Sequence, residues 1–256
     1  AFFSVVTYGA VAVPILHEFH PNQVHDIVNH SESKLFFVGE REYANLDAAA
    51  MPGLTGIVGI NDYEILSSKK DNLVQARENL NKLFGERFPN TFRPQDVQYH
   101  QCEPEELAVI NYTSGTTSNS KGVMIPYRAL SSNIEFGIGA IGHFVKPGDR
   151  VLSMLPMAHM YGMAFEFLFE FISGMHVNFL TKMASPTILL KALAEVKPVI
   201  IVMVPLIMEK IVRKSIMPKI QDPKVKLLMK MPVIGDSIKK KIREGLSSAL
   251  GGNFYE

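Results

Sequence analysis

Short apolar runs alternate with longer segments of helical periodicity along most of the chain, and this order constrains the fold more than any other feature. The alternation is typical of a mostly parallel sheet whose faces are covered by helices. Strands are predicted at 35–38, 56–60, 107–112, 123–125, 151–155, 176–180 and 199–202. Helices are predicted at 22–30, 72–84, 127–142, 186–196 and 204–216. We therefore expect an α/β fold.

Composition excludes several classes of protein. The 256 residues are 47% hydrophobic and 20% charged, which favours a globular protein with a buried core over a disordered chain. A net charge of +1 supplies no general field that would attract nucleic acid. The single cysteine, Cys102, excludes an internal disulfide and fits a reducing compartment, so we expect a cytoplasmic protein. Gly9, Pro14 and Pro205 interrupt the apolar runs, which therefore predict buried core and not a membrane span.

A turn composition at 146–149, Lys-Pro-Gly-Asp, marks a candidate joint between two parts of the chain. We predict a first α/β subdomain over 1–145 and a second over 150–256.

The most informative stretch for function is 112–124, in which seven residues are Thr, Ser or Asn. Gly115 and Gly122 let backbone N–H groups approach a bulky anion, and Lys121 adds a mobile positive charge. Such a loop can surround the oxygens of a polyphosphate. The plain alternative is a polar hairpin tip, because turns favour the same residue types.

A Walker A loop is the first alternative among phosphate loops, and the spacing argues against it. Ser120 stands where that pattern needs Gly, and Gly122 follows Lys121 where it needs Ser or Thr. A Walker loop also opens a helix, whereas 123–125 is an apolar run that ends at Pro126 and predicts a strand. We expect the loop to join two strands. A helix beginning at Gly122 would instead favour a P-loop kinase or ATPase.

Residues 113–122 resemble the phosphate loop of the adenylate-forming superfamily, Thr-Ser-Gly-Thr-Thr-Gly-x-Pro-Lys-Gly. This superfamily comprises acyl-CoA synthetases, nonribosomal adenylation domains and firefly-type luciferases. The departures are Ser118 for Gly and Ser120 for Pro, which affect the mobility of the loop. Further likeness lies at 9–14 and 27–34, and 155–162 resembles the Leu-Pro-Leu-Ala-His segment of long-chain fatty acyl-CoA synthetases.

The resemblance implies layered α-β-α subdomains of an N-terminal domain that is incomplete at both ends. It also implies ATP-dependent activation of a fatty acid to an acyl-adenylate and then to acyl-CoA, with ATP and Mg²⁺ as cofactors and CoA as co-substrate. The implied nucleotide-binding residues are Thr113, Ser114, Gly115, Thr116, Thr117, Ser118, Lys121 and Gly122. Mg²⁺ would reach Thr116 through the phosphates. Lys121 and His159 are the implied catalytic residues, and His159, Tyr161 and Gly162 the implied substrate pocket.

Other parts of the family pattern cannot be placed on this chain. Glu166 comes one position late, and without the expected Thr, for the Tyr-Gly-x-Thr-Glu magnesium motif, which belongs further along. The ribose-binding Asp and the C-terminal domain with its adenylating Lys are also absent, so we expect the isolated fragment to be inactive. An aryl- or amino-acid-activating enzyme of the same superfamily and a non-catalytic nucleotide-binding module remain alternatives.

Two further patterns are weighed against simpler explanations. Residues 209–245 carry eleven Lys or Arg against four acidic residues, which suits peripheral contact with an anionic lipid surface or, as we prefer, a solvated helical face. The histidines at 17, 20, 25 and 30 lack the i, i+4 spacing of a helical zinc site, so we expect solvated polar residues.

Overall fold

The computed structural model describes residues 1–113, 121–182, 184–215, 217–229, 231 and 234–253. Contacts divide the chain into two compact units, Ala1–Ala129 and Leu130–Glu256, and each is considered by itself. This division comes before the joint predicted at 146–149, so most of the helix over 127–141 belongs to the second unit. The α/β fold class is confirmed, because helices and strands alternate in both units.

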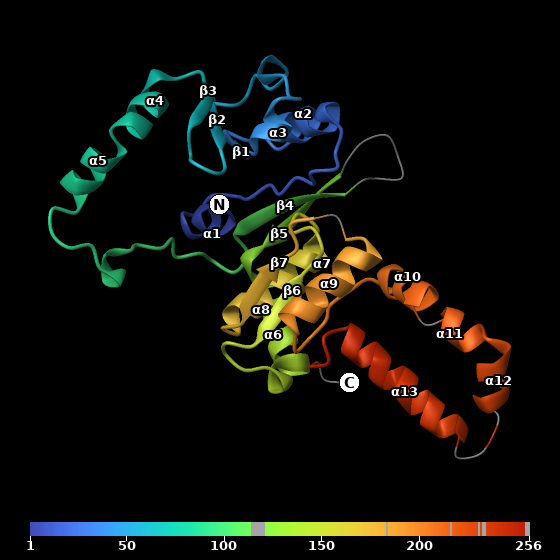
Figure 1. Ribbon diagram of the computed structural model, residues 1–256. Helices are drawn as coiled ribbons and strands as arrows, with labels where there is room; N and C mark the ends of the chain where they lie inside the picture. Colours follow the sequence, from blue (N-terminus) through green and yellow to red (C-terminus); the bar gives the residue numbers. More distant parts are fainter. Residues whose placement is uncertain (114–120, 183, 216, 230, 232–233, 254–256) are drawn as a thin grey trace. The chain divides into compact units, whose positions relative to one another are not determined.

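The first unit contains a small mixed sheet in the order β1-β2-β3 (Figure 1). β1 (Leu35–Val38) and β2 (Gly56–Gly59) are parallel, and β3 (Ile65–Ser68), which was not predicted, pairs with β2 in the antiparallel direction. The other elements before β4 are α1 (Phe2–Thr7), α2 (Pro21–His30), α3 (Glu40–Tyr43), η1 (Ala48–Ala50), α4 (Asp71–Glu78), α5 (Leu80–Arg87) and η2 (Pro94–Asp96). The helix predicted over 72–84 is thus two helices that meet at Asn79.

Helix α2 forms much of the core of this unit. The His20 side chain accepts a hydrogen bond from the Asn22 N–H, and Pro21 supplies a fixed φ in the first turn. Val24 and Val28 are one turn apart and therefore lie on the same face of the helix. They pack with Ile57 of β2 and with Val38, Met51 and Leu54.

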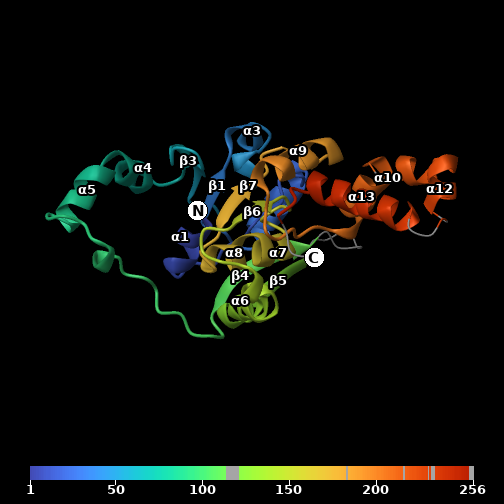
Figure 2. The same cartoon turned by 60° about the horizontal axis from the view of Figure 1, so that its bottom comes forward.

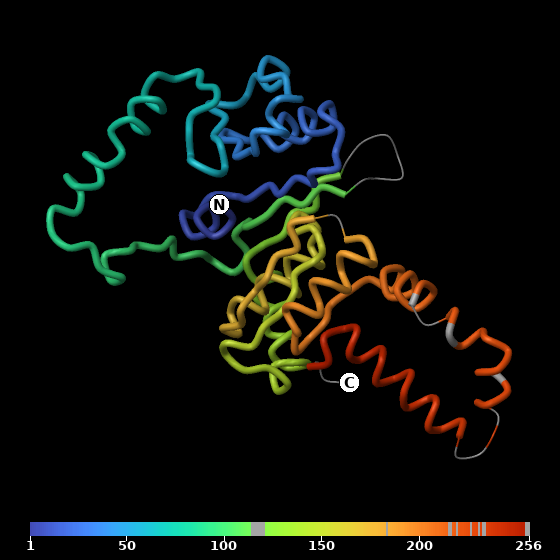
Figure 3. The backbone as a smooth tube through the Cα atoms, in the orientation of Figure 1, coloured from blue at the N-terminus to red at the C-terminus, as the bar shows by residue number. Residues whose placement is uncertain are grey.

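A hairpin of β4 (Leu107–Thr113) and β5 (Lys121–Pro126) completes the first unit. The strands are antiparallel, and an edge of β4 also receives the segment around Ala12. The Ala12 N–H donates to the Ala108 carbonyl at 2.9 Å, and the Ile110 N–H donates to the Ala12 carbonyl at 2.9 Å. Figure 3 shows this early segment running beside the hairpin.

The second unit is built on a parallel pair, β6 (Arg150–Ser153) and β7 (His176–Phe179). Val151 packs with Phe169 on one face of β6, while Leu152 packs with Leu189 and Leu193 on the other. Helices therefore cover both faces, as the figures show from two directions (Figure 1, Figure 2). The elements here are α6 (Tyr127–Ile141), η3 (Gly142–Phe144), α7 (Met160–Met163), the π-helix η4 (Ala164–Leu168), α8 (Phe169–Ile172) and α9 (Pro186–Val196).

Two expectations about the sheets are wrong. The strands are not mostly parallel, because the short links after β2 and β4 return the chain as antiparallel hairpins, and the described strands form three small sheets. The strand predicted at 199–202 does not form either. This segment lies beside β6, where the Val199 N–H donates a hydrogen bond to the Arg150 carbonyl. Its neighbour Pro198 has no N–H with which to extend a ladder.

The remaining helices are α10 (Pro205–Ser215), α11 (Met217–Gln221), α12 (Pro223–Met229) and α13 (Ile234–Ala249). Acidic side chains pair with bases on the same helix at Glu209–Arg213 (2.7 Å) and Asp236–Lys239 (3.1 Å). Such pairs suit the solvated helical face, and contact with lipid stays a prediction. None of the helices in the described ranges is long and apolar enough to cross a bilayer.

Candidate functional site

The predicted phosphate loop is carried by the β4–β5 hairpin. Thr113 ends β4 and pairs with Lys121, the first residue of β5, and both are exposed. The prediction that the loop joins two strands is confirmed, and the P-loop alternative is wrong because a strand, not a helix, includes Gly122. The other predicted nucleotide-binding residues, Ser114, Gly115, Thr116, Thr117 and Ser118, lie outside the described residues.

The loop end of the hairpin makes a contact that the sequence did not indicate. The Tyr112 hydroxyl lies 2.6 Å from Nδ1 of His30, which ends α2, and burial raises the pKa of Tyr112. A Cβ on Gly122 would lie 2.9 Å from the Ile110 side chain and 3.0 Å from the Tyr112 ring. Gly122 therefore makes room for the buried ring and has a structural role besides any at the loop.

His30 is also one of the histidines expected to be solvated polar residues. It is exposed, in agreement with that expectation, and it also bonds to Tyr112, while His25 accepts a hydrogen bond from the Asp47 N–H at 3.1 Å. With the cap made by His20, these contacts give each of the three histidines a local structural role.

The second predicted group of site residues lies just after β6, in the second unit. His159 is the exposed residue that precedes α7, and its N–H donates to the Pro156 carbonyl at 2.9 Å. Gly162 is buried against the same carbonyl, since a Cβ there would lie 2.8 Å from the Pro156 oxygen. Gly162 is thus needed for a close backbone approach, and it holds the turn that presents His159.

A row of aromatic side chains begins two residues after His159 in the sequence. Tyr161 is 46% exposed, and its ring centroid is 5.3 Å from that of Phe165. Phe165 in turn lies 6.2 Å from Phe136 of α6. These three rings form a partly exposed apolar row on the helix that follows His159 and on α6.

Two buried carboxyl groups lie on the helix that follows His159, and neither was predicted as a site residue. Glu166 is 0% exposed and Glu170 is 2% exposed. Glu166 accepts hydrogen bonds from the Met154 N–H at 2.8 Å and the Leu155 N–H at 2.6 Å. The available signal was the presence of two acids four residues apart in the otherwise apolar run 163–172.

Burial raises the pKa of both carboxyl groups. Desolvation raises the pKa of Glu166 to about 7, against the lowering effect of its backbone hydrogen bonds. Desolvation, followed by the charge of Glu166, raises the pKa of Glu170 to about 8. Oε1 of Glu166 and Oε2 of Glu170 have no hydrogen-bond partner among the described residues.

Neither group is placed as a magnesium ligand by this geometry. Glu166 directs one oxygen at backbone amides, and the described part of the chain contains no cluster of three His, Cys, Asp or Glu able to hold a metal. Thr116, which the resemblance linked to Mg²⁺ through phosphate, lies outside the described residues. The residues described therefore do not fit a protein-held Mg²⁺, and we derive no step through it.

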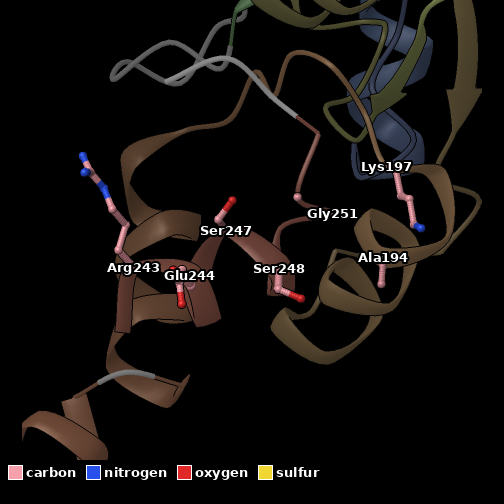
Figure 4. A pocket seen from close by; sticks show the side chains of 8 residues that line it. Ala194, Lys197, Arg243, Glu244, Ser247, Ser248 and Gly251 are labelled. Carbon is pink, nitrogen blue, oxygen red and sulfur yellow. The ribbon is translucent and has the colours of Figure 1, made fainter. Parts of the chain in front are cut away.

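A pocket of about 570 Å³ lies between the ends of α9 and α13, but it holds none of the predicted site residues. Figure 4 shows Lys197 and Arg243 on opposite sides of it, with their charged ends directed away from each other. The two cations do not converge on a single anion, so this pocket is not a second candidate for the phosphate site.

Known proteins resemble this chain in sequence and in fold. It is 36% identical over 134 residues to long-chain-fatty-acid–CoA ligase 4 of Saccharomyces cerevisiae, which covers 50% of this chain and 19% of the yeast protein. It is 32% identical over 168 residues to human long-chain-fatty-acid–CoA ligase 1, covering 60% of this chain and 22% of that protein. The chain thus spans about a fifth of the length of these relatives.

Among solved structures, a red-emitting luciferase from Phrixothrix hirtus superposes with a TM-score of 0.67 at 18% identity, over 97% of this chain and 46% of the luciferase. The inhibitor-bound N-terminal domain of FACL13 from Mycobacterium tuberculosis gives a TM-score of 0.61 at 22% identity, over 87% and 48%. These likenesses show a shared fold. The family model described as AMP-binding enzyme matches residues 1–256, and the chain belongs to this family.

Proposed function

We propose that this chain is part of an ATP-dependent ligase that activates a fatty acid, first to the acyl-adenylate and then to acyl-CoA. The observation that carries the proposal is the hairpin in which Thr113 and Lys121 face each other across the ends of β4 and β5. These two exposed residues flank the hydroxyl- and glycine-rich segment 114–120. The sequence similarity to long-chain-fatty-acid–CoA ligases supports a fatty acid as the substrate.

The chemistry assigns separate tasks to the two groups of residues. In the first step a carboxylate oxygen attacks the α-phosphorus of ATP, and the bond from that phosphorus to pyrophosphate breaks. Lys121 and the hydroxyl and amide groups of 113–122 would hold the β- and γ-phosphates and stabilise the charge on the departing pyrophosphate. Loss of one preorganised donor of this kind typically costs about 2.7–4 kcal/mol in the transition state.

His159 and Tyr161 belong to the acyl side of the proposal. His159 would position the carboxylate, while the aromatic row that begins at Tyr161 would contact the hydrocarbon chain. In the second step the CoA thiolate attacks the acyl carbonyl carbon, and the bond from that carbon to the adenylate oxygen breaks with release of AMP. The adenylate is the better leaving group, which is why the carboxylate is activated first.

Pyrophosphate exchange tests the first step in the complete polypeptide that contains this chain. With ATP and labelled pyrophosphate, we expect exchange to require a long-chain fatty acid and to be much weaker with an aryl acid or an amino acid. Lys121→Ala should reduce exchange by about 10² to 10³-fold, as for loss of one stabilising donor. Lys34→Ala removes another exposed lysine of the first unit and should leave the rate unchanged.

Exchange that requires an aryl acid or an amino acid in place of the fatty acid would identify an aryl- or amino-acid-activating enzyme of the same superfamily. A non-catalytic nucleotide-binding module is the second candidate, and it predicts that ATP raises the melting temperature without any exchange. The 256-residue chain alone is expected to form no acyl-CoA, and mass spectrometry that detected the thioester above a Lys121→Ala control would contradict this expectation.

A further inference from the structure

The Glu166 side chain accepts hydrogen bonds from the end of β6 and the segment that follows it. Its Oε2 atom lies 2.8 Å from the Met154 nitrogen, 2.6 Å from the Leu155 nitrogen and 3.4 Å from the Ser153 Oγ atom. Ser153 is the last residue of β6 and pairs with Phe179, the last residue of β7. The chain leaves the ladder there, so the next two N–H groups need another acceptor, and Glu166 supplies it.

The local helix geometry is unusual at the same place. Residues 160–172 are helical throughout, but 164–168 form a π-helix, whose wider turn changes the direction of the side chains on it. Glu166 is the middle residue of that turn and is fully buried. Burying a carboxyl group with one unpartnered oxygen is costly, and an apolar side chain would fill the space at less cost.

The segment held by Glu166 is the one that presents His159. After Leu155, the Pro156 carbonyl accepts the His159 N–H at 2.9 Å, and Gly162 packs against that same carbonyl. The His159 carbonyl then accepts the Met163 N–H at 2.9 Å, which begins the helix. Glu166 therefore connects the two sides of His159. It lies on the helix that follows His159, and it holds the backbone of Met154 and Leu155, which precede His159.

We propose that Glu166 is a positioning residue for acyl activation, whose carboxyl oxygen fixes the backbone at Met154 and Leu155 and thereby places the His159 ring against the reacting carboxylate. The inference rests on the proposed function for its effect on the reaction. The mechanical part, the hold on the two amides, stands on the geometry alone.

Variants of Glu166 separate positioning from simple stability. In pyrophosphate exchange by the complete polypeptide, Glu166→Ala should lower kcat/KM for the fatty acid by about 10 to 10²-fold, as expected for a displaced reacting group. KM for ATP should stay the same. Glu166→Gln keeps an oxygen that can accept both N–H groups and should retain the wild-type value within about threefold.

Glu170→Gln is the matched control, because Glu170 is as deeply buried one turn further along the same helix, whereas the hydrogen bonds to Ser153, Met154 and Leu155 come from Glu166. It should leave kcat/KM unchanged. A loss in Glu170→Gln equal to that in Glu166→Ala, or a loss in Glu166→Gln, would overturn the proposal.

A double-mutant cycle tests whether Glu166 acts through His159. On a His159→Ala background, Glu166→Ala should cause less than about a twofold further loss, since the group that it positions is gone. Independent, additive losses would overturn the proposal.

Amide hydrogen exchange at Met154 and Leu155 gives a readout that does not depend on the reaction. Glu166→Ala should accelerate exchange at both amides by tenfold or more, while Glu170→Gln leaves it unchanged. If the wild-type protein exchanges no pyrophosphate with any acid, the proposed function fails. The amide rates then still decide whether Glu166 holds the turn, and equal rates in Glu166→Ala and the wild type would overturn that hold.

Discussion

Glu170 makes the stability of the second unit depend on pH in a direction opposite to that of most carboxylates. Its pKa rises from 4.5 to about 8 on folding, because desolvation and then the charge of Glu166 disfavour its ionised form. Between these two pH values the folded protein binds a proton that the unfolded chain releases. The stability due to this proton is fully present below pH 4.5, and it is lost as the pH rises through about 8.

The magnitude follows from the same two values. An interval from 4.5 to about 8 corresponds to about 5 kcal/mol, at 1.36 kcal/mol for each pH unit. Glu166, with a pKa of about 7, adds a smaller contribution in the same direction. Glu170→Gln replaces the protonated acid by a neutral group of the same shape. We expect this variant to match the wild type near pH 5 and to be several kcal/mol more stable at pH 8, on the order of the value above.

Urea denaturation followed by tryptophan fluorescence measures the pH dependence of stability in the second unit, which contains Glu170. The sequence contains no tryptophan, so Phe179→Trp on β7 places a single reporter in the second unit. Phe179 is 49% exposed beside another phenylalanine ring, and the larger side chain can be accommodated there. Both proteins carry the reporter and are compared at half-unit steps from pH 5 to pH 9.

The control and the refutation come from the same data. Glu195→Gln, an exposed acid on α9 in the same unit, should leave the pH dependence as it is in the reporter protein. A midpoint for the reporter protein that stays constant from pH 5 to pH 8, or one that falls equally with and without Glu170, would refute the reasoning from burial.

Three further predictions test the packing and the hairpin. Gly137→Ala on α6 places a Cβ 2.7 Å from the packed Phe169 ring and should lower the free energy of unfolding by roughly 1–3 kcal/mol in urea denaturation. In Gly139→Ala the new Cβ meets nothing within 4 Å, so this variant should raise the free energy of unfolding by about 0.5–1 kcal/mol. Equal effects of the two variants would contradict the packing. His30→Ala and Tyr112→Phe remove the same 2.6 Å hydrogen bond, so each should lose about 1 kcal/mol and the double variant should show coupling; full additivity would argue against the bond. Lys121→Ala should leave the melting temperature of the free chain unchanged, because this side chain is exposed, and should reduce the increase caused by ATP; an undiminished increase would exclude Lys121 from the nucleotide site.

The hairpin and most of the regular elements were predictable from the sequence because their signals are local. The apolar run before Thr113 and the run from Val123 to Pro126 predict strands, and the polar residues between them predict a turn. The spacing around Lys121 was enough to reject a strand-to-helix phosphate loop. Helix α2 could likewise be placed, since Pro21 and the spacing of Val24 and Val28 mark its start and its inner face.

Strand pairing was less predictable, because an apolar run in the sequence does not indicate which other strand it will pair with. The run at 199–202 is more apolar than β6, yet it lacks a ladder and joins β6 through a hydrogen bond at Val199. β3 was missed since Ile65–Ser68 has only two apolar residues, and its neighbour β2 supplies the pairing that makes it a strand.

The sequence by itself determined which residue types gather at the hairpin and at His159, and with them the chemistry that these segments can perform. Only the tertiary structure decided that Glu166 holds the turn before His159. Its partners lie eleven to thirteen residues away, and the contact forms because β6 ends where the π-helix directs a side chain. The sequence shows where a carboxyl group lies along the chain, but the burial and the hydrogen-bond donors that set its pKa exist only when the chain has folded.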